Sequence, residues 1–94
     1  MTYSLTFLKS AKKEWDNLSP TIKQQFKNKL IKCLENPLRE KDKLHGMEDC
    51  YKIKLRAAGY RLVYKVYKDR LVVQVVAVGK RDKSFVYKQA MTRM

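Results

Sequence analysis

The sequence predicts an α+β fold in which helices pack on one face of an antiparallel sheet. Three observations lead to this expectation. Apolar residues recur at helical spacing within residues 8–34, alternate with basic residues from residue 51, and become almost continuous over residues 71–78. Ninety-four residues suffice for one hydrophobic core. We therefore expect residues 1–94 to form a single domain: an N-terminal strand, a two-helix hairpin, a three-stranded antiparallel meander and a short C-terminal helix.

The first half of the chain is predicted to form one strand and the helical hairpin. Residues 2–7 alternate apolar and polar side chains as a strand does, whereas the apolar residues of 8–18 recur at helical spacing. Ser19 and Pro20 are a typical N-cap and first residue of a second helix. This helix is expected to end at residues 36–37, because a residue that precedes proline avoids helical geometry. One apolar stripe from each helix then covers the sheet.

A β-hairpin follows, in which apolar and basic residues alternate on the first strand and a glycine marks the turn. A four-residue loop at 56–59 would keep the apolar residues of both strands on one face. The expected pairs are Leu55 with Tyr60, Ile53 with Leu62, Tyr51 with Tyr64, and Lys54 with Arg61. The other face then carries Lys52, Lys54 and Arg61 together, and like charges placed opposite each other cost stability. That face is predicted either to bind a polyanion or to be an ordinary solvated surface.

The remaining segments are a connection, a central strand and a terminal helix. Residues 38–48 are polar and irregular, and residues 68–69 form a tight turn after the hairpin. Residues 71–78 are apolar at nearly every position, which is typical of a strand buried on both faces and predicts a central place in the sheet. Residues 79–82 are expected to leave the sheet, and residues 83–93 to form the short helix.

Positive charge is the strongest global feature. Lys and Arg total 22 against 9 Asp and Glu, a formal charge of +13, and residues 49–94 hold 12 basic and 3 acidic residues. Positive charges at this density repel one another within a small domain, which favours a nucleic-acid partner over an acidic protein or a membrane surface. The apolar runs are too short to span a membrane and the N-terminus does not resemble a signal peptide, so a cytoplasmic protein is expected. Cys33 and Cys50 lack metal or redox spacing and are expected to be free thiols.

The chemistry available to the chain is narrowed by what the sequence lacks. A single histidine argues against a two-histidine acid–base pair or a metal site, and neither a glycine-rich phosphate loop nor a serine-triad motif occurs. No metal and no cofactor is therefore expected. Lysine, arginine and tyrosine remain, and they can support RNA cleavage because RNA carries its own nucleophile, the 2′-hydroxyl. A lysine that acts as the base needs a lowered pKa, which neighbouring cations favour.

Five segments carry a family resemblance along nearly the whole chain: Lys43-Leu44-His45-Gly46-Met47, Cys50-Tyr51-Lys52-Ile53-Lys54-Leu55-Arg56, Gly59-Tyr60-Arg61-Leu62-Val63-Tyr64, Val78-Gly79-Lys80-Arg81 and Val86-Tyr87. They resemble the RelE-type toxins of bacterial and archaeal type II toxin–antitoxin systems. The Leu-x-Gly and Gly-Tyr-Arg-Leu-x-Tyr patterns are shared by the wider RelE/ParE superfamily, whereas the basic residues together with the tyrosine indicate the RelE branch. His45 stands where close relatives often carry an arginine, and it is expected either to contact RNA or to cap its loop.

The resemblance implies a RelE-like fold and an endoribonuclease that enters the ribosomal A site and cuts the mRNA codon there, which inhibits translation. In such enzymes the 2′-hydroxyl attacks, leaving a 2′,3′-cyclic phosphate and a 5′-hydroxyl. The implied partners are the ribosome, with its mRNA and 16S rRNA, and a cognate RelB-like antitoxin. Operator DNA would be bound only through the antitoxin complex. The alternative on the same fold is a non-enzymatic, ParE-like inhibitor of DNA gyrase.

The resemblance also implies roles for individual residues. Lys54 would be the base, and Arg81 the acid or the group that stabilises the leaving oxygen. Lys52 and Arg61 would hold the phosphate, and Tyr87 would orient the substrate, with its ring available for stacking. We expect Arg81 and Tyr87 to fold back over the face that carries the other three. Further contacts to RNA or rRNA are expected from a second set: His45, Arg56, Lys65, Lys80 and Lys83.

Overall fold

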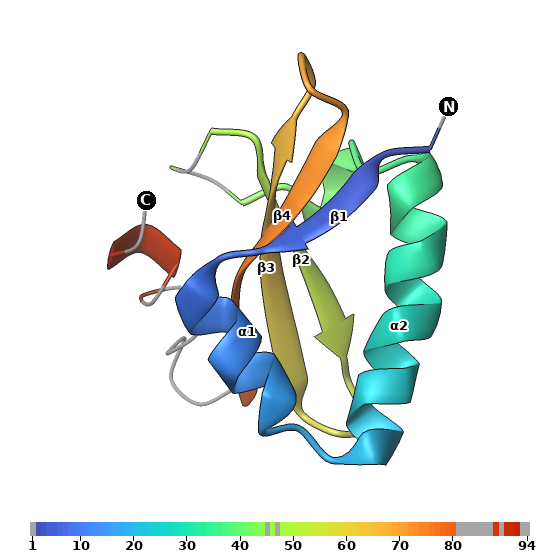
Figure 1. Ribbon diagram of the computed structural model, residues 1–94, viewed down its shortest axis with the longest axis vertical. Helices are drawn as coiled ribbons and strands as arrows, with labels where there is room; N and C mark the ends of the chain where they lie inside the picture. Colours follow the sequence, from blue (N-terminus) through green and yellow to red (C-terminus); the bar gives the residue numbers. More distant parts are fainter. Residues whose placement is uncertain (1, 45, 47, 81–87, 89, 93–94) are drawn as a thin grey trace.

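The computed structural model describes residues 2–44, 46, 48–80, 88 and 90–92. Within this part of the chain, four strands form one sheet, which is accompanied by two helices (Figure 1). The elements are, in chain order, β1 (Ser4–Phe7), α1 (Lys9–Asp16), α2 (Pro20–Glu35), a short 3-10 helix η1 (Glu40–Asp42), β2 (Cys50–Leu55), β3 (Tyr60–Tyr67) and β4 (Val72–Lys80). Residues 88 and 90–92 are helical, in agreement with the expected terminal helix. The predicted α+β class is confirmed.

The sheet has the order β1-β4-β3-β2, so β4 is central as its continuous apolar sequence predicts. β1 pairs with β4 in parallel, and β2, β3 and β4 form the expected antiparallel meander. The expectation that the chain leaves the sheet at residue 79 is wrong. Gly79 pairs with Arg61 and Lys80 pairs with Tyr60, because β3 starts early enough to offer both residues a partner for their backbone hydrogen bonds.

The β2–β3 hairpin has the predicted register. All four expected pairs are formed: Leu55 with Tyr60, Ile53 with Leu62, Tyr51 with Tyr64, and Lys54 with Arg61. The loop of residues 56–59 closes with a hydrogen bond of 2.8 Å from the Gly59 N–H to the Leu55 carbonyl. Gly59 has a φ of +71°, a conformation that glycine adopts without the steric cost that a side chain brings.

Both faces of β4 are buried. Its register against β3 shifts at Val63 and Tyr64, and the extra residue of this β-bulge is Val76. The bulge changes the alternation, so that Val76 and Ala77 lie on the same side, in a small cluster with Val63 and Ala90. Ala90 belongs to the terminal helical residues and packs on the sheet face opposite α1 and α2. The expectation that the helices pack on one face of the sheet is therefore confirmed for α1 and α2 but wrong for Ala90.

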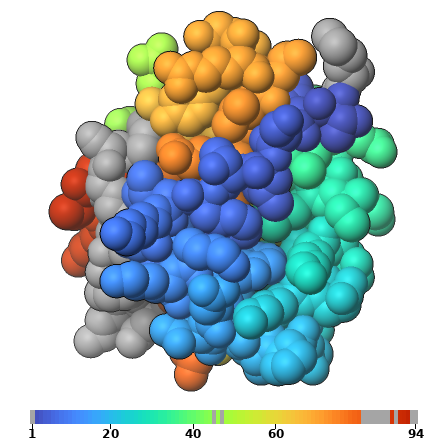
Figure 2. Space-filling model, viewed as in Figure 1, coloured from blue at the N-terminus to red at the C-terminus, as the bar shows by residue number. Residues whose placement is uncertain are grey.

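The main core lies between the sheet and the two helices, which form much of the surface seen in Figure 2. The ring centroid of Trp15 on α1 lies 5.3 Å from that of Phe7 and 6.1 Å from that of Phe26 on α2. α2 begins as predicted, with the Ile22 N–H donating to Ser19 Oγ at 3.3 Å. In the described part of the chain, neither helix has the length and apolar character needed to cross a membrane.

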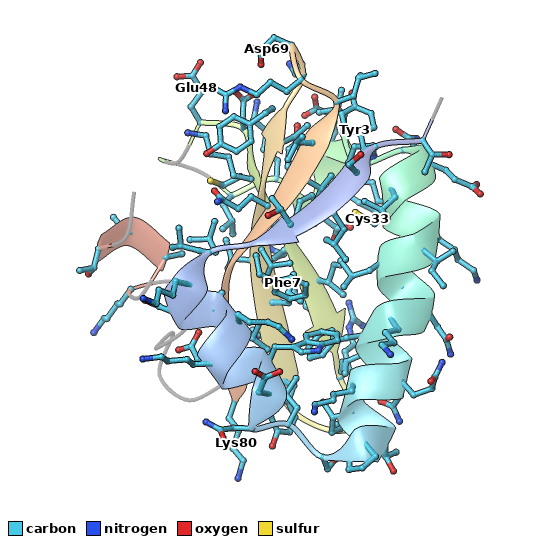
Figure 3. All side chains as sticks on the ribbon, viewed as in Figure 1. Tyr3, Phe7, Cys33, Glu48, Asp69 and Lys80 are labelled. Atoms are coloured by element: carbon cyan, nitrogen blue, oxygen red, sulfur yellow. The ribbon has the colours of Figure 1, made fainter. Side chains whose placement is uncertain are left out.

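The two cysteines are buried free thiols, as expected. Cys33 points from α2 toward the sheet (Figure 3). Cys50 begins β2 and belongs to the cluster on the opposite face. Burial raises the pKa of both thiols, which makes them poor nucleophiles. Neither cysteine is therefore a candidate for the chemistry of this protein.

Candidate nucleic-acid interface

The hairpin brings three of the predicted site residues together on one surface, here called the basic face: Lys52, Lys54 and Arg61. Lys54 and Arg61 are directly opposite each other on β2 and β3, and Lys52 is two residues away along β2. All three are half-buried. Their common orientation follows from strand alternation, because the apolar residues between them turn toward the helices.

The electrostatics of the basic face favour the neutral form of Lys54. The positive charge of Lys52 lowers the pKa of the Lys54 ammonium, and desolvation and the charge of Arg61 act in the same direction. Asp42 opposes this shift. A lowered pKa increases the fraction of neutral amine at a given pH, which is what a lysine needs to accept a proton. The arrangement therefore lowers the pKa of Lys54, which is the direction that a lysine base requires.

A cleft of about 560 Å³ lies at the open edge of β2, between this strand, α2 and the segment around η1. We call it the β2-edge cleft. Six of its ten lining residues are cationic and one is acidic, so it is strongly positive. The lining residues are Lys29, Cys33, Arg39, Lys41, Asp42, Lys52, Ile53, Lys54, Arg56 and Tyr64.

Three cations of this cleft, Lys29, Arg39 and Lys41, were not among the residues that the sequence singled out. Lys29 comes from α2, where an exposed lysine is indistinguishable in sequence from an ordinary solvated one. In the structure its ammonium donates a hydrogen bond of 2.8 Å to the Lys54 carbonyl, which ties α2 to β2. Strand alternation predicts which residues share a face of a hairpin, but it carries no information about what another element places beside its edge.

The other predicted RNA contacts within the described part are spread along the hairpin and β4. Arg56 is exposed in the hairpin loop and also lines the β2-edge cleft. Lys65 is half-buried on β3, with its ammonium 5.2 Å from the centre of the Tyr67 ring. Lys80 is exposed at the end of β4 that lies far from the Asp69 turn (Figure 3). Lys80 thus lies at the same end of the sheet as Arg61, whereas Lys65 does not.

Four predicted site residues lie outside the described part of the chain: His45, Arg81, Lys83 and Tyr87. The expectation that Arg81 and Tyr87 fold back over the basic face therefore stays a prediction. The end of β4 is nevertheless defined, since Gly79 pairs directly with Arg61. Neighbouring strands lie roughly 5 Å apart. β4 thus leads the chain past the basic face immediately before residue 81.

Comparison with known proteins identifies relatives over the full length of the chain. The family model described as the ParE toxin of the type II toxin–antitoxin system parDE matches residues 5–85. The mRNA interferase toxin RelE of Escherichia coli K12 is 52% identical over 94 residues, covering 100% of this chain and 99% of that protein.

Solved structures agree with this result. The free E. coli toxin RelE, as a double arginine-to-alanine mutant, superposes with a TM-score of 0.92 at 51% identity, covering 100% of this chain and 99% of the other. The toxin in the intact E. coli RelBE toxin–antitoxin complex gives a TM-score of 0.83 at 52% identity, covering 86% of this chain and 99% of that one.

Proposed function

The chain belongs to the RelE-type toxins of type II toxin–antitoxin systems, and from this membership we propose that it inhibits translation by cleaving mRNA in the ribosomal A site. The observation that carries the proposal is the 52% identity, over the whole chain, to an mRNA interferase. The matching family model is named for the ParE toxin. The 52% identity to RelE over the full length, together with the basic face, nevertheless favours RNA cleavage over gyrase inhibition.

The reaction uses the RNA's own 2′-hydroxyl as nucleophile. Attack on the adjacent phosphorus forms a 2′,3′-cyclic phosphate and breaks the bond to the 5′-oxygen, which departs as a hydroxyl. Lys54 accepts the proton of the 2′-hydroxyl, and the lowered pKa caused by Lys52 supports this role. Lys52 and Arg61 stabilise the extra negative charge that the phosphorane carries, because both lie on the same face as Lys54.

Two further groups complete the proposed site. Arg81 donates the proton that the departing 5′-oxygen needs, or stabilises its negative charge until it takes a proton from water. Tyr87 orients the substrate, with its ring available for stacking on a base, as the family resemblance implies. Neither metal nor cofactor has a step in this mechanism. A site made of cations without a strong base depends on exact placement of the RNA, so the ribosome supplies the alignment that makes in-line attack possible. Arg56, Lys65, Lys80, Lys83 and His45 then contact RNA or rRNA.

The biological setting follows from the same membership. E. coli RelE has been solved in complex with its antitoxin RelB. The corresponding partner of this chain is a cognate RelB-like antitoxin, which neutralises a toxin of charge +13 and binds operator DNA together with it. The toxin acts in the cytoplasm, where its ribosomal target is found. Residues 1–94 act as one domain.

The decisive experiment adds the purified protein to ribosomes programmed with a defined mRNA and maps the resulting ends. We expect cuts within the A-site codon that leave a 2′,3′-cyclic phosphate. An mRNA with a single deoxyribose at the cut site should stay intact, because it lacks the nucleophile. Cleavage of that mRNA would refute the mechanism. Inhibition of gyrase supercoiling without any mRNA cleavage would refute the proposed function.

A further inference from the structure

The β2-edge cleft contains three cations for which the cleavage mechanism has no use: Lys29 on α2, Arg39 beside η1 and Lys41 within it. They share the cavity with cations of β2 and its loop, and Asp42 is the one acid among the lining residues. Cations collected in a half-enclosed space repel one another, and the repulsion is stronger there than in open water. An anion in the cleft would relieve it.

The segment that carries Arg39 and Lys41 is fixed on both sides. Before it, the buried hydroxyl of Tyr64 donates a hydrogen bond of 2.9 Å to the Pro37 carbonyl. After it, the Leu44 N–H donates to the Cys50 carbonyl at 2.9 Å. The backbone therefore holds both cations over the edge of β2 before any ligand arrives, which reduces the entropic cost of binding one.

Arg39 is the cation best suited to meet a phosphate. It is half-buried and forms no ion pair with any residue in the described part of the chain. Arg39 and Cys33 of α2 line the same cleft, so Arg39 lies across the cavity from the α2 wall. A guanidinium offers parallel N–H donors that match two phosphate oxygens. Lys29 adds ammonium donors beyond the one used on Lys54.

We propose that the β2-edge cleft is a second phosphate-binding subsite, which holds the backbone phosphate of a nucleotide flanking the cut. This inference rests on the proposed function, because it places the scissile phosphate on the basic face. Lys52 and Lys54 belong to both the basic face and the cleft, so the two are continuous across β2. Phosphate contacts carry no sequence information. The subsite therefore contributes affinity and register for any codon.

The subsite is tested by measuring RNA binding at a series of salt concentrations. The probe is a short, fluorescein-labelled single-stranded RNA with one deoxyribose at the cut site, so that it binds without being cleaved. The full chain and its Arg39→Ala/Lys41→Ala variant are compared by fluorescence anisotropy. We expect about tenfold weaker binding at low salt. The slope of log affinity against log salt concentration should be less steep by about 0.7, which is the value for one lost phosphate contact on a single strand.

Two further variants control for overall charge. Lys9→Ala/Lys13→Ala removes the same charge from exposed positions on α1, outside the cleft, and should leave the salt slope unchanged. Asp42→Asn removes the acid from the cleft and should strengthen binding. Equal effects of the two double variants, no effect of the cleft variant, or absence of salt-dependent binding by the unmodified chain would each overturn the proposal.

A ribosome assay separates the subsite from the cleavage function itself. On programmed ribosomes the cleft variant should need a higher ribosome concentration for half-maximal cleavage, with an unchanged rate at saturation, because it loses binding shared by ground state and transition state. If the unmodified chain does not cut at all, the proposed function fails, while the anisotropy experiment still reports on the subsite. If it cuts and the cleft variant behaves identically in both assays, the subsite alone is refuted.

Discussion

Along β2, Tyr51, Ile53 and Leu55 turn toward the helices, whereas Lys52 and Lys54 turn away from them. On the first side the ring of Tyr51 stacks on that of Tyr64 across the strand pair, with centroids 5.6 Å apart. On the second side cations are neighbours and repel. Apolar burial stabilises the hairpin from one face, and repulsion between like charges weakens it from the other. Stability and chemistry thus occupy alternate residues, so single substitutions should affect one without the other.

The largest effect on the charged side is expected for Lys54→Ala. Removal of the proposed base should lower the single-turnover cleavage rate on programmed ribosomes by about 10²- to 10⁴-fold. The thermal unfolding midpoint should stay close to that of the unmodified chain, because the side chain is only half-buried and does not belong to the main core. Lys32→Ala, an exposed lysine on α2, is the matched control. Full activity of Lys54→Ala would remove this residue from the mechanism.

The complementary substitution on the apolar side is Leu62→Ala. Leu62 is fully buried and directly follows Arg61, but it faces the helices. We expect the free energy of unfolding to fall by about 2–5 kcal/mol, as for other buried leucines cut to alanine. Denaturant titration measures the loss, and cleavage per folded molecule should be retained at low temperature. A catalytic loss as large as that of Lys54→Ala, in a folded protein, would show that the two faces are not separable.

A smaller effect is expected for Tyr64→Phe, which removes one hydroxyl from the apolar side. The Pro37 carbonyl then loses a buried hydrogen bond, which should cost about 1–3 kcal/mol in denaturant titration. Because this bond anchors the segment before Arg39, RNA binding should weaken slightly as well. Tyr60→Phe, at a half-buried position on the same strand, serves as the comparison. Equal stability of the two variants would show that the anchor contributes nothing.

The subtlest change is expected for Lys52→Gln, read from the pH dependence of cleavage. The charge of Lys52 is the first cause of the lowered pKa of Lys54. A base acts when deprotonated, so the rate rises with pH through this pKa. Loss of the charge raises the pKa, and the rising limb should therefore move to higher pH, whatever happens to the maximal rate. An unmoved or downward-shifted limb would contradict the role of Lys52 in activating Lys54.

Strand periodicity explains why so much of the hairpin was predictable. A register slip by one residue would exchange Leu62 for Arg61 on the buried face, so a single alignment of β2 on β3 satisfies the apolar residues, and it is the one observed. The end of β4 was mispredicted because a glycine does not end a strand when a neighbouring strand offers its backbone a partner. Gly79 has such a partner, since it pairs with Arg61 of β3.

The site was less accessible to sequence reasoning than the fold. Periodicity identifies Lys52, Lys54 and Arg61 because they share two adjacent strands. Lys29 is 25 residues from Lys54 along the chain, and only the packing of α2 against the edge of β2 brings them together. No local pattern encodes such an encounter. Arg81 and Tyr87 were selected solely by resemblance to a family, and no strand or helix pattern in the sequence distinguishes them from surface residues.

β2 is an edge strand of the sheet. Beyond the isolated bridge between Lys43 and Tyr51, no strand in the described part pairs with its outer side. An unpaired strand edge can accept a strand from a second copy and so begin aggregation. Here any copy would bring the same lysines against Lys52 and Lys54, and the Lys29 ammonium already occupies the Lys54 carbonyl. We therefore expect the cations that suit the protein to a polyanionic substrate also to hinder its aggregation, and a variant stripped of all three lysines should lose solubility together with activity.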